Sequence, residues 1–75
     1  MKIGVKMYGP LRRYVEGGEG ILAVPEGARL GDLLQQMMVG EDEAGVIMVN
    51  DRIAKTSQLL REGDQVKVLG VVSGG

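Results

Sequence analysis

The sequence predicts an α+β domain in which a mixed sheet of about five strands packs on one main helix. Two observations carry this prediction. Apolar residues alternate with polar ones in several short segments that glycine and proline separate, and one longer segment repeats its apolar residues at helical spacing. Each element then has a single apolar face, and a sheet laid over one helix buries these faces together. A length of 75 residues suits one such domain.

The first third of the chain predicts two strands. Within residues 2–8 every second side chain is apolar, namely Ile3, Val5 and Met7. Gly9-Pro10 ends this strand, because proline has no N–H to donate to a sheet. Residues 11–15 predict a turn or two of helix. A second strand is expected over residues 20–24, paired with the first in a hairpin through the glycine-rich loop at residues 17–20.

The middle of the chain predicts the helix. After a turn at Pro25-Glu26-Gly27, apolar residues follow at positions i, i+3, i+4, i+7 and i+8, namely Leu30, Leu33, Leu34, Met37 and Met38. A helix of this extent is about 14 Å long and can cross one face of a small sheet. Gly40 is the expected stop, and Glu41-Asp42-Glu43 follows as an acidic loop.

The second half predicts three more strands. Residues 46–49 and 52–55 read as two short strands around a tight turn, because Asn50 and Asp51 both tolerate the left-handed conformation that such turns require. Residues 59–60 predict a short turn, and residues 65–69 the last strand. The order is β-β-α-β-β-β, and the crossover through the helix implies that some strands are parallel.

Composition excludes several classes of function. With 44% hydrophobic residues the chain is too apolar to be disordered, and a net charge of −1 argues against binding nucleic acid through bulk electrostatics. It has no Cys and no His, so cysteine nucleophiles, His-dependent triads and the usual zinc sites are excluded, and catalysis by this chain alone is not expected. No apolar run is long enough for a membrane span. We therefore expect no metal, no membrane association and a cytoplasmic location.

The end of the chain is the main candidate for function. Gly74-Gly75 lacks side chains and can thread a narrow channel to present a carboxylate where a branched residue would clash. We divide the chain into a domain over residues 1–69 and a flexible tail over residues 70–75. Leu69, Val71 and Val72 lead into this tail and predict an apolar patch for another protein. The alternatives are a frayed end and simple packing of the strand end.

Three further motifs have weaker functional readings. Residues 17–20 have the glycines of a phosphate loop but no Lys-Ser/Thr after them, so a plain hairpin is the preferred interpretation. Residues 41–43 lack the spaced ligands of a calcium loop, and we expect a solvated acidic loop. Arg12-Arg13 is suited to an acidic partner but is more simply a solvated pair.

Taken in order, several motifs resemble those of MoaD-type sulfur carriers, of the MoaD/ThiS family, from residue 2 to residue 75. They are the first strand with its Leu11-Arg12 turn, the helix entry Pro25-Glu26-Gly27-Ala28 with Gly31-Asp32-Leu33-Leu34, the hairpin Val49-Asn50-Asp51-Arg52, the approach Leu60 with Glu62-Gly63-Asp64-Gln65-Val66, and the end Val72-Ser73-Gly74-Gly75. Each motif is weak alone, whereas their order and spacing together are specific.

The resemblance implies a ubiquitin-like β-grasp fold and a protein co-substrate rather than an enzyme. An activating enzyme of the E1-like MoeB/ThiF type would use ATP and magnesium to adenylate the Gly75 carboxylate. A sulfur donor protein would then displace AMP and leave a thiocarboxylate. In MoaD proteins the tail, here Ser73, Gly74 and Gly75, inserts into the MoaE-type large subunit of molybdopterin synthase, which adds sulfur to a pterin precursor. No cofactor is expected on the chain itself.

Two departures leave the pathway open. The family's hairpin usually has Gly where this chain has Asp51, and MoaD proteins commonly have Pro-Pro where it has Leu69-Gly70-Val71-Val72. A thiamin-pathway carrier that serves thiazole synthase typically lacks the Leu11-Arg12 turn, so the resemblance is closer to MoaD. Carriers for tRNA thiolation, a modifier attached to lysines and a ubiquitin-like interaction module with an inert tail remain alternatives.

Overall fold

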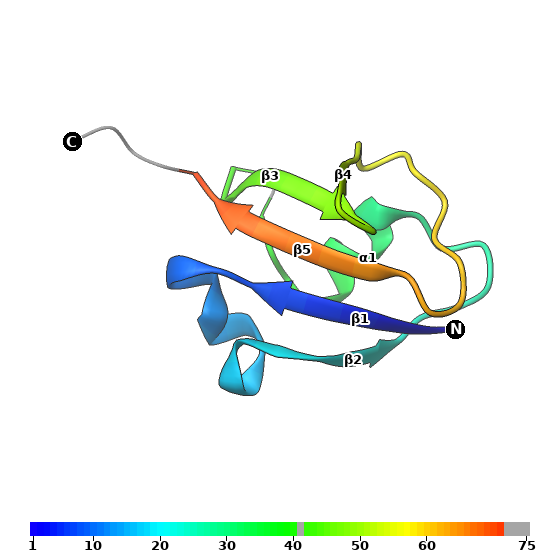
Figure 1. Ribbon diagram of the computed structural model, residues 1–75, viewed down its shortest axis with the longest axis horizontal. Coiled ribbons are helices and arrows are strands. Elements are labelled where there is room, and N and C mark those ends of the chain that lie inside the picture. Colours follow the sequence, from blue (N-terminus) through cyan, green and yellow to red (C-terminus); the bar gives the residue numbers. More distant parts are fainter. Residues whose placement is uncertain (41, 72–75) are drawn as a thin grey trace.

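The computed structural model describes residues 1–40 and 42–71 and has a five-stranded sheet with one α-helix against one face (Figure 1). In chain order its elements are β1 (Lys2–Met7), β2 (Glu19–Ala23), α1 (Leu30–Gln36), β3 (Ala44–Val49), β4 (Arg52–Ile53) and β5 (Gln65–Gly70). The predicted order β-β-α-β-β-β and the predicted fold class are therefore confirmed.

The last strand lies in the centre of the sheet. The strand order is β2-β1-β5-β3-β4, and β5 pairs in parallel with β1 and antiparallel with β3. The β1·β2 and β3·β4 pairs are antiparallel hairpins. The sheet is thus mixed, as predicted, and its parallel pair is β1·β5, whereas the strands that α1 connects, β2 and β3, are not neighbours.

The core lies between α1 and the face of the sheet on which α1 packs. Alternate residues of the two central strands point into it, and Ile3 of β1 and Val68 of β5 are completely buried. From the helix, Leu30, Leu33 and Leu34 meet them. Burying aliphatic side chains of this size contributes roughly 1.5–3 kcal/mol each relative to exposure.

The connection between β1 and β2 contains the short helical segment that the sequence predicts near residues 11–15, and a second one in place of the predicted glycine-rich loop. Two 3₁₀ helices, η1 (Gly9–Tyr14) and η2 (Glu16–Gly18), fill it, and β2 begins inside the predicted loop at Glu19. Pro10 starts η1 because its fixed φ suits a first helical turn. Leu11 is buried and holds η1 against the end of the sheet.

The helix ends earlier than the apolar spacing predicts. Its last residue is Gln36, and Met38 adopts a left-handed φ of 64°. The N–H of Met38 donates to the Gln35 carbonyl at 3.0 Å, and the N–H of Val39 donates to the Leu34 carbonyl at 2.9 Å. This is a Schellman motif closed by a methionine instead of the expected Gly40. It buries Val39 and leaves Met38 82% exposed.

The β3–β4 turn follows the prediction. Asn50 and Asp51 have φ values of 51° and 67°, as a type I′ turn requires at both central positions. The strand after the turn is shorter than predicted, because β4 ends at Ile53. The last strand is longer by one residue and includes Gly70, the first residue of the predicted tail.

We predict that Met38→Gly stabilises the domain by about 0.5–1 kcal/mol. Holding a side chain in the left-handed region costs about 1–2 kcal/mol, while glycine costs about 0.5–1 kcal/mol in backbone entropy. Urea unfolding followed by circular dichroism measures the difference. Met37→Gly is the control: Met37 has φ −82°, so glycine relieves no strain there and should destabilise. A loss of stability in Met38→Gly would contradict the free-energy cost that we assign to the left-handed conformation of Met38.

Candidate functional site

The site begins where β5 ends. The predicted reactive and threading residues Gly75, Gly74 and Ser73, together with Val72, lie outside the described residues. The structure describes the base of the tail, Leu69, Gly70 and Val71. This base lies at the end of the sheet near η1, and the N-terminus lies at the opposite end (Figure 1). Because β5 is the central strand, the base of the tail lies between β1 and β3 at this end of the sheet.

A cluster of three side chains supports the base of the tail. The N–H of Val71 donates to the main-chain carbonyl of Glu43 at 3.2 Å. The Glu43 carboxylate accepts hydrogen bonds from the Tyr14 hydroxyl and, at 3.2 Å, from the Arg13 guanidinium. The Arg13 guanidinium also lies 4.9 Å from the centre of the Tyr14 ring. We call Arg13, Tyr14 and Glu43 the tail clamp.

The tail clamp adds an ion pair to two interpretations of the sequence. Arg13 is 61% exposed, as expected of a solvated arginine, and it pairs with Glu43 between η1 and the segment before β3. The side chain of Glu43 is 33% exposed. The same residue accepts the Val71 N–H through its main-chain carbonyl, so Glu43 joins the side-chain cluster to the base of the tail. Their separation of 30 residues along the chain hides the pairing from sequence reasoning.

Gly45 lets β3 pass close to the base of the tail. The register of β3 against β5 shifts between Ala44 and Val46, which is the signature of a β-bulge. A Cβ on Gly45 would lie 2.9 Å from the carbonyl oxygen of Gly70 and 3.1 Å from the Cα of Val71. Only glycine fits without a shift of the backbone. A lone glycine inside a strand is the signal by which the sequence could have indicated this bulge.

Gly70 itself has room for a side chain. The nearest atom to a Cβ there would be in Leu11 at 3.7 Å, an ordinary van der Waals distance. The close approach at the tail base therefore depends on Gly45, and the packing around Gly70 does not require glycine.

Apolar side chains surround the end of β5 on the outer face of the sheet, opposite α1. Leu69 is 36% exposed and directly opposes Val46, which is 43% exposed, and Val71 is 58% exposed. Met48 of β3 opposes Lys67 two pairs further along, on the same face, and Ile53 of β4 opposes Met48. We call Val46, Met48, Ile53 and Leu69 the outer-face patch.

A lysine borders the outer-face patch. The ammonium of Lys67 donates to the Asp51 carboxylate at 2.7 Å. This hydrogen bond, together with the charge of the carboxylate, raises the pKa of Lys67 above its ordinary value. The ion pair with Asp51 thus favours the charged form of Lys67. A surface that covers the patch must accommodate this ion pair.

The glycine-rich loop and Arg12, which the sequence offered as weaker candidates, have structural roles. Gly17 and Gly18 have φ values of 76° and 83°, so these glycines make the turn of η2, and the Arg12 side chain packs on Gly18. Among residues 1–40 and 42–71, no group of three or more acidic, histidine or cysteine side chains is placed to hold a metal ion. None of the described helices is long and apolar enough to cross a membrane.

Comparisons with known proteins agree with the sequence resemblance. The profile of the ThiS family matches residues 5–75, which include the tail. A solved structure described as a putative molybdopterin converting factor, subunit 1, from Pyrococcus furiosus is 28% identical, with a TM-score of 0.77 over 96% of this chain and 99% of that one. No curated protein matches the sequence.

Two more distant structures share the fold. Small archaeal modifier protein 1 of Haloferax volcanii is 14% identical, with a TM-score of 0.78 over 95% of this chain and 98% of that one. A chain in the complex of subunits 1 and 2 of the molybdopterin-converting factor from Helicobacter pylori is 21% identical, with a TM-score of 0.67 over the full length of both chains. The expected ubiquitin-like β-grasp fold is thus confirmed.

We predict that Gly45→Ala destabilises the domain by about 1–3 kcal/mol, the usual cost of overpacking, and displaces the base of the tail. Urea unfolding measures the first effect, and the NMR chemical shift of the Val71 amide reports the second. Gly40→Ala is the matched control, because a Cβ there would meet side-chain atoms of Asp42 and Glu43 but no backbone atom. Equal stability of the two variants would contradict the close approach at Gly45.

Proposed function

Because the chain belongs to the ThiS family, we propose that it is a sulfur-carrier protein whose reactive group is the Gly75 carboxylate. The observation that carries this proposal is the extent of the family match, which includes the Gly74-Gly75 tail as well as the domain. The carboxylate attacks the α-phosphorus of ATP and releases pyrophosphate. A sulfur nucleophile then attacks the acyl carbon and expels AMP, which leaves a thiocarboxylate on Gly75.

The chemistry requires partners. A carboxylate is a poor electrophile until one of its oxygens becomes part of a good leaving group, and this chain has no His or Cys to assist the reaction. An E1-like adenylating enzyme of the MoeB/ThiF type would bind ATP and magnesium, and a sulfur donor protein would supply the sulfur. We place the reaction in the cytoplasm because it consumes ATP. The chain would act as a co-substrate and not as a catalyst.

We further propose that the sulfur goes to molybdopterin. The support is the 28% identity with the putative subunit 1 from Pyrococcus furiosus, which spans nearly all of both chains. A MoaE-type large subunit would then take the tail, and the outer-face patch would contact it beside the point where the tail enters. Leu69 and Val71 lie at that point, and their exposed apolar surface would become buried. Thiazole synthase is the alternative acceptor.

The tail clamp suits this role. A tail that is delivered into another protein's active site works best from a fixed base, because less freedom is then lost on binding. The hydrogen bond from Val71 to Glu43 provides such a base at the last described residue.

We predict that incubation with a MoeB/ThiF-type enzyme, ATP, magnesium and sulfide replaces one oxygen of Gly75 by sulfur. Intact mass spectrometry measures the exchange, and fragmentation locates it. Deletion of Gly75 should abolish the exchange without changing the melting temperature, because Gly75 lies beyond β5. An unchanged mass, with enzymes that convert a positive control, would favour the interaction module. An isopeptide bond to a lysine would instead identify a modifier.

We predict that Leu69→Asp weakens binding to a MoaE-type subunit by at least about tenfold, because a charge replaces an apolar contact at the centre of the interface. Isothermal titration calorimetry measures the affinity. Leu59→Asp is the matched control, since Leu59 is 51% exposed and lies outside the outer-face patch. If both variants bind as the wild type does, the patch is not the interface, although the thiocarboxylate chemistry could still stand.

A further inference from the structure

The strand β2 forms one edge of the sheet, and this edge carries a second surface. Met1 and Val24 exchange two hydrogen bonds, from the Met1 ammonium to the Val24 carbonyl at 2.6 Å and from the Val24 N–H to the Met1 carbonyl at 2.8 Å. In an antiparallel pair, residues that bond across the ladder alternate with residues whose N–H and C=O point away. The register places Ile21 and Ala23 in the second group.

Two contacts verify this alternation. Gly4 of β1 opposes Ile21, and its N–H bonds to the Asp64 carbonyl on the β5 side at 2.9 Å. The side-chain amide of Gln36 donates to the Ala23 carbonyl at 3.0 Å, as a neighbouring strand would. The N–H and C=O of Ile21 have no partner among the described residues. The edge of β2 thus presents backbone groups that another strand can pair.

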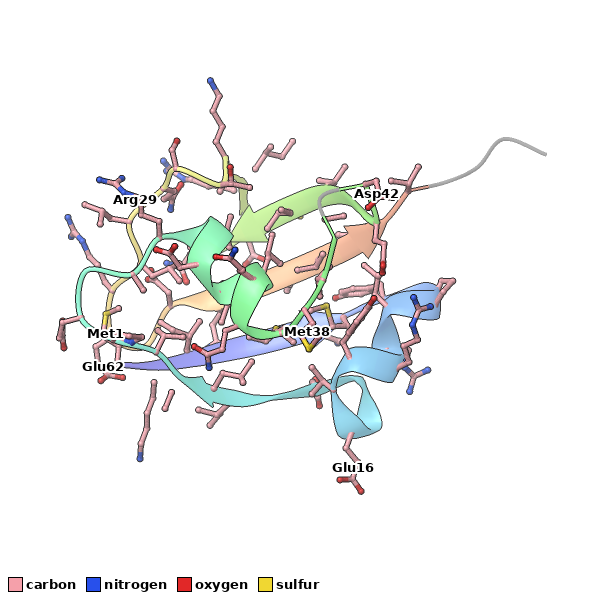
Figure 2. All side chains as sticks on the ribbon, turned by 180° about the vertical axis from the view of Figure 1, so that it is seen from behind. Met1, Glu16, Arg29, Met38, Asp42 and Glu62 are labelled. Atoms are coloured by element: carbon pink, nitrogen blue, oxygen red, sulfur yellow. The ribbon has the colours of Figure 1, made fainter. Side chains whose placement is uncertain are left out.

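An apolar groove runs beside this edge. It has a volume of about 420 Å³ and lies between β2 and the C-terminal end of α1, with Leu22 and Met37 in its lining. Ile21 is 74% exposed and Met38 82% exposed at its margins. Figure 2, seen from the helix side, shows Met38 at the end of α1 and Glu16 extending from the η2 turn. The Schellman motif that turns Met38 outward therefore also shapes this groove.

The charge beside the groove indicates which kind of segment binds there. Among the described residues that line the groove, Glu16 alone carries a charge, and no described lysine or arginine forms an ion pair with it. A basic residue on the occupant would complement it. The β2 strand of a second copy brings Glu19 and no cation, so pairing between two copies lacks this complement.

We propose that the β2 edge binds an extended peptide segment of another protein, which adds to the sheet as a sixth strand. Main-chain hydrogen bonds to Ile21 hold the segment, an aliphatic side chain enters the groove, and a lysine or arginine pairs with Glu16. Because β1 separates β2 from β5, the occupant leaves the outer-face patch and the tail accessible. The inference is independent of sulfur transfer: it adds a second docking surface, and loss of either function leaves the other testable.

The test uses the full chain and a blocked heptapeptide, Lys-Val-Thr-Val-Thr-Val-Lys, whose alternation suits a strand and whose ends are basic. A titration followed by ¹⁵N NMR should shift the amides of Ile21 and Ala23 most, with a dissociation constant on the order of 100 μM. Ile21→Pro removes the outward N–H, which an edge strand tolerates, and should weaken binding at least tenfold. Leu59→Thr, at an exposed residue outside both the outer-face patch and the groove, is the control and should leave binding unchanged.

The peptide supplies a second arm in case Ile21→Pro fails to fold. N-methylation of the central valine removes a donor from the ligand alone and should also abolish the shifts. Glu16→Lys should weaken binding several-fold, and a peptide with glutamates in place of lysines should restore it. The proposal is overturned by shifts centred on β3 and β5, by equal binding of the methylated peptide, or by no shift at 1 mM peptide (about ten times the expected constant). Concentration-dependent shifts without peptide would identify a second copy as the occupant and overturn it as well.

Discussion

The pairing of β5 between β1 and β3 is the constraint on which the rest of the structure depends. It joins the two halves of the chain, because each half otherwise contributes a separate hairpin. Its inward residues, Val66 and Val68, are almost completely buried against the helix side of the sheet. The same pairing leaves the tail at the middle of one end of the sheet and β2 as a free edge. Both proposed surfaces are therefore consequences of one strand's position.

Much of the fold could be predicted from residues that act locally. Period-two alternation placed β1 and β5, and the Asn50-Asp51 pair predicted a turn whose two positive φ values the structure confirms. The end of α1 could not be predicted in this way, because burial of Val39 outweighs the strain at Met38. Likewise, the helical segment after β1 was predicted, whereas the second 3₁₀ helix, η2, and the early start of β2 at Glu19 were not. Tertiary packing decides such boundaries, and a sequence window does not contain it.

The candidate site, like the fold, could be predicted only where its residues act locally. The reactive positions Gly74 and Gly75 were predicted from composition and resemblance and lie outside the described residues, whereas the exposure of Leu69 and Val71 fits the apolar approach to the tail that the sequence suggested. The tail clamp was missed because Glu43 meets its partners across 29 and 30 residues. Acidic and basic residues in loops are usually solvated, and nothing local distinguishes this pair. Gly45 was visible in the sequence as a glycine beside a predicted strand. Only the register of β3 against β5 shows that this glycine lies next to the base of the tail.

The central position of β5 also affects how the protein is made. Synthesis proceeds from the N-terminus, so β1 and β3 emerge from the ribosome long before the strand that joins them. Until residues 65–70 are free, the nascent chain has two hairpins without a common core, and isolated hairpins are marginal in water. A chain without residues 65–70 therefore lacks both the central strand of the sheet and the residues Leu69 and Gly70 at the base of the tail. Completion of the fold and availability of the tail are coupled in time.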